Sequence, residues 1–299
     1  MIRIFARILK NFKFLPVKKI LKFRHRAYTG KKLDLKNPKE FNEKLQWMKL
    51  YFHPTILTQL ACKYNVRSYV EAKIGKEYLN ELYGVYENTS EVDFSKLPKQ
   101  FILKGVHGCG LNLIVKDKDK LDIDEARKKM NKWLNHSHYS TKGYEWAYKN
   151  IKPLIICEKF LEQGDQPSLV DYKIYCFNGR ARFIGVYMDR VNGVKKGFYD
   201  LDFNKLPFTN TVFKKNDIYE AIEPENLSEM IVLAEKLADR LPFVRVDFYS
   251  IKDKIIFGEM TFYPTDGKKD FKPEKYNRII GDYLTLPKIP KGKKRITEI

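Results

Sequence analysis

Long apolar runs and closely spaced cysteines are both missing from this sequence of 299 residues. No apolar run approaches the roughly 18 residues that cross a bilayer, which excludes a transmembrane helix. The N-terminus carries a cation every three or four residues, so we expect no secretory signal. The four cysteines lie 47, 48 and 19 positions apart, which excludes a C-x-x-C metal or redox motif. Free thiols in a reducing cytosol, and hence a cytoplasmic protein, are the simplest interpretation.

Acidic residues are absent from the first 33 positions, which contain 11 Lys or Arg. The whole chain has 57 basic and 37 acidic residues and a net charge of +20, so more than half of the excess lies in this segment. Such a charge predicts acidic partners. Before Pro16, apolar residues at helical spacing lie opposite cations and predict a basic amphipathic helix. The segment either contacts an anionic membrane peripherally or docks on its own domain; nucleic acid is the least favoured partner.

The remaining pattern mixes hairpins and helices. Residues 37 to 60 are predicted to be helical, as are stretches that begin at Asp122 and Leu227. Apolar strands are predicted at 101–104, 111–115, 154–161, 172–177, 182–188, 244–250 and 255–262. The Pro- and Lys-rich stretch 288–295 is expected to be a loose tail. Because neighbouring strands form hairpins, the pattern indicates an α+β fold and not a doubly wound sheet.

The last predicted hairpin carries the sharpest group of charged residues. Arg245 and Asp247 are two positions apart and therefore share one face of a strand. With a turn near residue 252, Glu259 on the next strand lies nearly opposite Asp247. Two carboxylates beside an arginine can hold Mg²⁺ against nucleotide phosphates. The alternative is an ion-pair cluster on the surface, which would contribute little stability.

A glycine loop between the first two strands provides a place for phosphates. Its residues are His107, Gly108, Cys109 and Gly110, and Lys104 lies on the strand before it. Backbone N–H groups of such a loop can wrap an anion, to which Lys104 adds a cation. A G-x-G pattern is also typical of ordinary turns. A histidine in a loop is more often a hydrogen-bonding residue than a catalyst, so we assign the His107 side chain no acid or base role.

Taken in order, these segments resemble the ATP-grasp superfamily and, within it, the teichuronopeptide-biosynthesis (TupA-like) branch found near capsule and surface-polysaccharide genes. The resemblance covers residues 38 to 287 and is carried by four motifs: KYNVRSYV, FILKGVHGCGLNLIVK, IICEKFL and VRVDF…FGEMTF. It implies two α+β lobes that clamp ATP. The expected parts are a basic N-terminal segment (1–36), a helical and mixed region (37–98), a glycine-loop lobe with its hinge strand (99–161), a C-terminal lobe with the Mg²⁺ site (162–287) and a basic tail (288–299).

The same resemblance implies a role for each matching residue. Lys63 and Lys104 would contact phosphates, covered by the loop from His107 to Gly110. Adenine would be read along the hinge residues Glu158, Lys159, Phe160 and Leu161, largely through backbone groups at 159 and 161, and ribose by Asp165. Lys195 or Lys196, of which we prefer Lys196, would add a phosphate contact, and Arg245 would hold the reacting carboxylate or phosphoryl group. Asp247 and Glu259 would bind Mg²⁺, with Thr261 where many relatives have asparagine.

The activity that the resemblance implies is an ATP-dependent carboxylate–amine ligase. ATP and Mg²⁺ would convert a carboxylate, expected to be a uronic acid of a surface polysaccharide or its precursor, into an acylphosphate. An amino acid or another small amine would then form the amide. Two other functions stay open: a kinase on the same fold, which stops at phosphoryl transfer, and a non-enzymatic protein that binds polyanions. The basic N-terminus suits an enzyme at the inner face of the cytoplasmic membrane.

Overall fold

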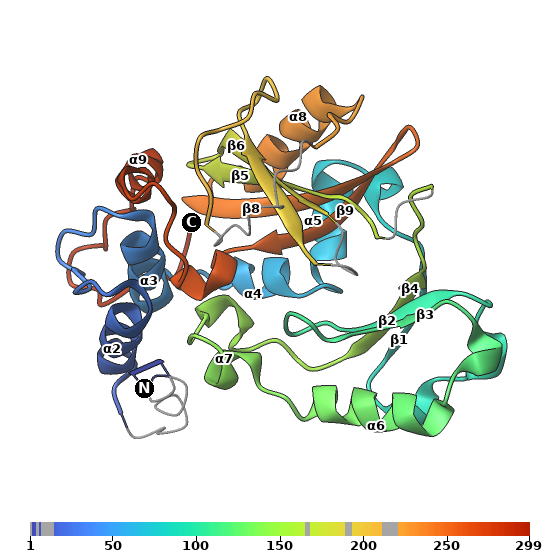
Figure 1. The fold of residues 1–299 in the computed structure, drawn as a ribbon. Coiled ribbons are helices and arrows are strands. Elements are labelled where there is room, and N and C mark those ends of the chain that lie inside the picture. Colours follow the sequence, from blue (N-terminus) through green and yellow to red (C-terminus); the bar gives the residue numbers. More distant parts are fainter. Residues whose placement is uncertain (1, 4–5, 7–14, 165–167, 189–192, 211–220) are drawn as a thin grey trace.

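Two antiparallel sheets and the helices around them form the structure, a computed structural model that describes residues 2–3, 6, 15–164, 168–188, 193–210 and 221–299 (Figure 1). Its α-helices are α2 (Val17–Thr29), α3 (Phe41–Tyr51), α4 (Ile56–Ala61), α5 (Val66–Lys73), α6 (Ile123–Leu134), α7 (His138–Thr141), α8 (Leu227–Ala238) and α9 (Lys275–Tyr283). Its strands are β1 (Leu82–Tyr86), β2 (Phe101–Gly105), β3 (Asn112–Val115), β4 (Ile155–Lys159), β5 (Asp171–Phe177), β6 (Arg180–Met188), β7 (Lys195–Tyr199), β8 (Phe243–Ile251) and β9 (Lys254–Thr261).

The smaller sheet has the strand order β1-β4-β2-β3. Helix α6 packs on β2, and the two bury one apolar cluster that includes Phe101, Leu103 and Met130. Side chains alternate across a strand, so Lys104 on β2 faces away from α6. Glu158 on β4 lies opposite Ile102 and therefore shares this second face. The small lobe thus buries one side of its sheet and turns two charged residues toward the rest of the molecule.

The larger sheet has the order β7-β6-β5-β8-β9 and lies across the molecule from the small lobe (Figure 1). Helix α8 packs on β5, β6 and β8. Arg245 and Asp247 of β8 lie on the opposite face of the sheet from α8. Lys173 of β5 shares that face, because it pairs with Asp247 in the register. We call this surface the inner face of the large sheet. Alternation along two neighbouring strands thus separates a charged face from the apolar face that α8 covers.

A bulge in the β8–β9 hairpin brings Glu259 onto the inner face. Phe248 of β8 pairs with Phe257 of β9. The next residue of β8, Asp247, pairs with Glu259, so that Gly258 is skipped. Without that extra residue, Glu259 would face the α8 side. A Cβ atom at Gly258 would lie only 3.0 Å from the Asp247 carbonyl oxygen, so glycine lets the bulge pack closely.

Charged side chains also attach the N-terminal helices to the body. Asp266, in the turn Pro264–Gly267, accepts bonds from Arg24 of α2, Lys49 of α3 and its neighbour Lys268. Lys49 has a completely buried side chain, and its ammonium group also donates to the backbone oxygen of Asp266. We call these four side chains the helix network. They link residues more than 200 positions apart in the sequence.

The structure confirms the α+β class and the predicted strands, contains β1, α5 and α9 in addition, and differs from two further expectations. The helix expected over 37–60 breaks before Pro54 into α3 and α4. The expectation of a loose tail was wrong, because Ile296 is buried and exchanges backbone hydrogen bonds with Tyr51 and His53. Among the described residues, no helix combines the length and apolar character needed to cross a membrane.

Candidate functional site

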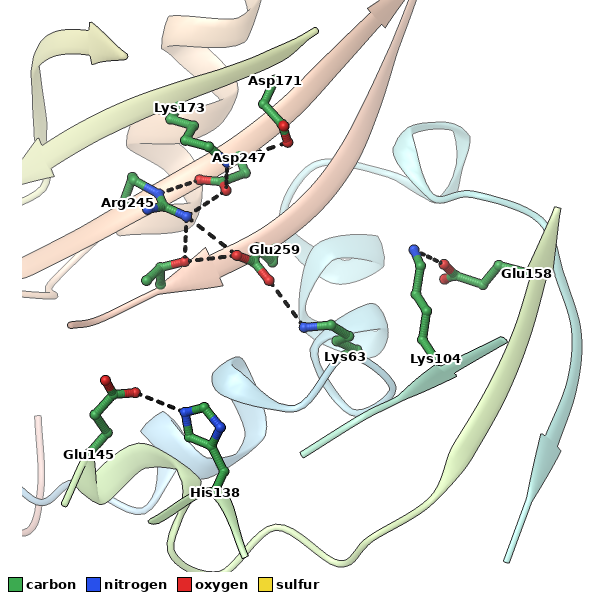
Figure 2. A network of polar contacts seen from close by, with 11 residues as sticks. Lys63, Lys104, His138, Glu145, Glu158, Asp171, Lys173, Arg245, Asp247 and Glu259 are labelled. Atoms are coloured by element: carbon green, nitrogen blue, oxygen red, sulfur yellow. Dashed lines mark hydrogen bonds and ion pairs between the residues drawn. The ribbon is translucent and has the colours of Figure 1, made fainter. Parts of the chain in front are cut away.

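The inner face of the large sheet gathers a connected set of charged side chains (Figure 2). The Arg245 guanidinium donates to both oxygens of Asp247, at 2.7 Å each, and at 3.3 Å to Glu259. Lys173 of β5 bonds to Asp247 and, at 3.3 Å, to Asp171. Lys63, which precedes α5, donates to Glu259 at 3.1 Å. We call these six residues the cleft network; its members are Lys63, Asp171, Lys173, Arg245, Asp247 and Glu259.

Electrostatic pairing keeps Glu259 and Lys63 of the cleft network ionised. Burial alone would raise the pKa of Glu259, but Lys63, Arg245 and Lys173 hold it well below its usual range. Burial would lower the pKa of Lys63, and Glu259 raises it instead. Asp247 is buried, whereas the Glu259 side chain remains 34% exposed. Glu259 is therefore the carboxylate of this pair that is open to an incoming ligand.

The small lobe faces this network with a second group of charges. Lys104 donates to Glu158 at 2.6 Å, and Arg67 of α5 donates to the same carboxylate at 3.2 Å. A cavity of about 30 Å³ lies beside them and is bounded on the large-lobe side by Tyr249 and Phe257. Small-molecule sites are typically about 300–1,000 Å³. Binding of a nucleotide here therefore requires the lobes or the Lys104–Glu158 pair to move apart.

The hinge residues are placed at the edge of this cavity. Strand β4 ends at Lys159, and Leu161 lines the cavity. The Lys159 N–H donates to the Glu81 carbonyl, and its carbonyl accepts a bond from the Asn80 side chain. These bonds occupy backbone groups of residue 159 within the protein. Phe160 contacts Lys116. Asp165, expected to bind ribose, lies outside the described residues.

Two buried histidines hold the glycine loop: His107, which is part of the loop, and His138, which lies against Gly108. The His107 Nε2 atom bonds to the Trp133 carbonyl at 2.8 Å, so the His107 side chain anchors the loop, and any contact with phosphate would come from its backbone. Gly110 adopts a φ of +74°, in the left-handed region that favours glycine. Cys109 is exposed. Whether this loop covers phosphates stays a prediction.

The sequence interpretation missed two parts of this site. Lys173 lies on the predicted strand 172–177, and Asp171 comes just before that strand, two positions from Lys173. This alternation of charged and apolar residues was the available signal. His138 bonds to Glu145 at 3.2 Å and approaches the glycine loop, because a Cβ atom at Gly108 would lie 2.8 Å from the His138 Nδ1 atom. No sequence pattern marks this second pair, which lies in the short helix α7 and in the turn that follows it.

Lys196, predicted to contact a phosphate, lies outside the cleft network. It lies on β7, where its ammonium group donates to Asn210. The Tyr187 ring of β6 contacts Lys196 at 5.5 Å and Lys173 at 5.1 Å, measured from each nitrogen to the ring centroid. Burial and Lys269 lower the pKa of Lys196 to about 7. Its phosphate contact stays a prediction.

The donor set at Asp247 and Glu259 suits magnesium in the presence of phosphates. Mg²⁺ commonly takes one or two carboxylates and completes its shell with water and phosphate oxygens. The two carboxylates are directly paired across β8 and β9, as predicted, and Glu259 has an open side. Asp247 would have to exchange a bond from Arg245 or Lys173. The Thr261 hydroxyl bonds to Arg245 and Glu259. Among the described residues, no group of three or more His, Cys, Asp or Glu side chains could bind a metal ion.

Fold and site together define an α+β protein with two lobes and a charged cleft between them. Residues 43–285 match the TupA-like ATPgrasp family, and since this is most of the chain, the protein belongs to that family, as the motifs indicated. No curated protein matches the chain.

Several solved structures are similar at a low level. The D-alanine–D-alanine ligase from Bacillus anthracis complexed with ATP has a TM-score of 0.42 and 13% identity, over 69% of this chain and 57% of that one. The ATP-grasp ligase PsnB, complexed with a phosphomimetic variant of its minimal precursor, Mg and ADP, has a TM-score of 0.42 and 10% identity, over 76% of this chain and 58% of that one. The D-alanine–D-alanine ligase from Helicobacter pylori gives 0.44 and 15%, over 84% and 68%. The chain thus spans less than two thirds of the first two proteins.

Proposed function

We propose that this protein is an ATP-dependent carboxylate–amine ligase that acts on an acidic sugar. The observation that carries the proposal is the cleft network, in which Arg245, Asp247 and Glu259 of the large sheet reach Lys63 near the small lobe. An arginine that holds an oxyanion beside two carboxylates that suit Mg²⁺ is an arrangement that supports phosphoryl transfer. Membership of the TupA-like ATP-grasp family supports the same chemistry.

In the proposed reaction, the γ-phosphoryl group of ATP passes to a carboxylate of the acceptor. This gives an acylphosphate and ADP, and attack by an amine then forms the amide and releases phosphate. Arg245 would orient the reacting carboxylate, while Lys63 and Lys104 would neutralise phosphate charge. Bound Mg²⁺ would supply further charge neutralisation at the phosphates. Closure of the two lobes would exclude water, which otherwise hydrolyses an acylphosphate.

We infer that the acceptor is a uronic acid of a surface or capsular polysaccharide, or of its precursor, and that the amine is an amino acid or a small relative.

Helix α2 supports a peripheral location at an anionic membrane. Its Ile20 and Leu21 are buried against the body, whereas cations occupy its exposed side. That side contains Lys18, Lys19, Lys22 and Arg26. The amphipathic pattern expected before Pro16 falls mainly outside the described residues.

The test is an ADP-release screen in which sugar acids are crossed with amines, followed by mass spectrometry of the products. A ligase gives sustained ADP release only when acid and amine are both present, and the product mass equals that of the amide. ADP release with an acceptor alone, together with a stable phosphorylated product, would instead identify a kinase. Absence of Mg²⁺-dependent ATP binding would reject both enzymes.

A further inference from the structure

The segment that joins α6 to β4 borders the cleft network and contributes no member to it. It contains α7 and a short 3-10 helix, Trp146–Tyr148. A Cβ atom at Gly143 would collide with the Asp266 side chain, so the segment lies directly against the turn that follows β9. Helix α4 packs on the 3-10 helix and on β9 alike. The segment is therefore held beside the end of β9 that carries Glu259 and Thr261.

Tyr148, the last residue of the 3-10 helix, has a fixed ring and a free hydroxyl group. Its ring packs on the ring of His138, with 4.4 Å between the centroids. His138 is itself buried and held by its bond to Glu145 (Figure 2). Tyr148 is only partly buried, and its hydroxyl makes no hydrogen bond within the described part of the chain. A donor that is held in place but has no protein partner is suited to bind a ligand.

The cleft network acts on this hydroxyl from the side opposite to His138. Burial raises the pKa of Tyr148 well above its ordinary value, Glu259 and Glu145 add to the rise, and Arg245 opposes it. Charge interactions weaken with distance, so the hydroxyl lies near the place where Arg245 meets Glu259. It stays protonated at neutral pH and can therefore donate a hydrogen bond without adding a charge to the site.

We propose that the Tyr148 hydroxyl donates a hydrogen bond to the acceptor carboxylate that Arg245 holds, and that Tyr148 is therefore a further substrate-contacting residue. This inference rests on the proposed function, because it takes the reacting carboxylate to lie at Arg245. A carboxylate has two oxygens with about four acceptor positions, so it can accept from a guanidinium and a hydroxyl at once. The ring packing on His138 sets the position of this donor before the ligand arrives.

Such a donor has a use in both steps of the proposed reaction. In the first step, one carboxylate oxygen attacks the γ-phosphorus and ADP leaves, while the Tyr148 hydroxyl holds the second oxygen in place. In the second step, the amine nitrogen attacks the carbonyl carbon, and negative charge develops on that second oxygen. Phosphate then leaves with the proton that the amine loses. Because a donor already aimed at a developing charge lowers the barrier, loss of the hydroxyl should reduce both affinity for the acid and turnover.

The first experiment measures binding by isothermal titration in the presence of a non-hydrolysable ATP analogue and Mg²⁺. The probes are glucuronate, galacturonate and their uncharged methyl esters. Tyr148→Phe removes only the hydroxyl and should weaken binding of the sugar acid at least tenfold, as expected for a hydrogen bond to a charged group. It should change binding of the ester less than twofold. Tyr283→Phe alters an exposed tyrosine on α9 and is the matched control, which should change neither.

The outcomes of this titration separate the inference from the proposed function. Equal affinity of the wild type and Tyr148→Phe for the acid overturns the inference alone. An equal loss for acid and ester overturns it too, because the hydroxyl then does not act through the carboxylate. If neither acid binds to the wild type, the proposed acidic-sugar acceptor is itself wrong, and the inference is overturned with it.

The second experiment separates the hydroxyl of Tyr148 from its ring. Tyr148→Phe should keep the urea midpoint of the wild type, whereas Tyr148→Leu loses the packing on His138 and should unfold at a lower urea concentration. In the ADP-release assay with acid and amine, Tyr148→Phe should lower kcat/KM for the acid at least tenfold and leave the KM for ATP within twofold. An unchanged kcat/KM for the acid overturns the proposal, whether or not the urea midpoint shifts.

Discussion

The cleft network and the helix network are both built from buried ion pairs, but they differ in where they end. The helix network brings Arg24, Lys49 and Lys268 to the single carboxylate of Asp266, whose side chain is only 10% exposed. The cleft network instead runs along a sheet to Glu259, whose side chain is 34% exposed, and ends at Lys63, which lines the cavity beside the small lobe. One arrangement is closed within the large body, and the other presents its last charge to a cavity.

This difference indicates what each network does. A buried ion pair gains little net stability over an apolar packing, because desolvation offsets most of its Coulomb energy. Removal of one partner is costly all the same, since the other charge remains buried. In the helix network the consequence is stability of the N-terminal attachment. In the cleft network, we propose that Lys63 and Glu259 exchange their mutual bond for bonds to phosphate and metal, so that the network serves ligand binding.

The largest expected effect is the loss of ADP release when a carboxylate of the cleft network is replaced. Asp247→Asn and Glu259→Gln should each reduce ADP release at least 100-fold, because each removes a carboxylate that suits Mg²⁺ and one of the two charged partners of Arg245. Asp253→Asn, in the exposed turn of the same hairpin, is the matched control and should retain full activity. Circular dichroism should show all three variants folded. Near-normal ADP release from both cleft variants would remove the metal role from this hairpin.

The second effect is on the helix network and concerns stability. Asp266→Asn leaves Arg24 and Lys49 buried without their counter-charge and should lower the free energy of unfolding by about 3 kcal/mol, measured by urea denaturation. Asp282→Asn removes the exposed Arg278–Asp282 pair on α9 and should cost at most about 0.5 kcal/mol. Equal losses in the two variants would show that burial does not distinguish these pairs.

The sequence predicted part of the cleft network, whereas it predicted nothing of the helix network. Alternation places Arg245 and Asp247 on one face, and the polar turn at 252–253 brings Glu259 near them. Counting from that turn does not decide which way Glu259 points, because the bulge at Gly258 depends on close packing of two backbones. Lys173 and Asp266 find partners 74 and 242 positions away, with Asp247 and Arg24 respectively. Periodicity identifies the face of a strand or helix but carries no information on such distant partners.

A smaller effect is expected where the small lobe meets the cleft. Lys104→Ala should weaken ATP binding about tenfold, or about 1.4 kcal/mol, because a charge-assisted contact to phosphate is lost. In the ligand-free protein its ammonium group pairs with Glu158, so part of the gain on binding is offset by the loss of that pair. Lys99→Ala, an exposed lysine just before β2, is the control. Isothermal titration with ATP and Mg²⁺ measures both, and equal affinities would exclude Lys104 from the phosphate site.

The smallest effect is the pH dependence of the helix network between pH 7 and pH 5. Burial would raise the pKa of Asp266, but Lys49, Lys268 and Arg24 hold it well below its ordinary value. A depressed carboxyl pKa stabilises the folded state above the unfolded pKa of about 3.9, and this contribution is lost as the pH falls toward the folded pKa. The stability difference between the wild type and Asp266→Asn should therefore be constant from pH 7 to pH 5. Below about pH 4 it should shrink by up to about 1.4 kcal/mol per pH unit. Urea denaturation at each pH checks this, and a difference that already declines above pH 5 would show that the three cations do not hold Asp266 ionised.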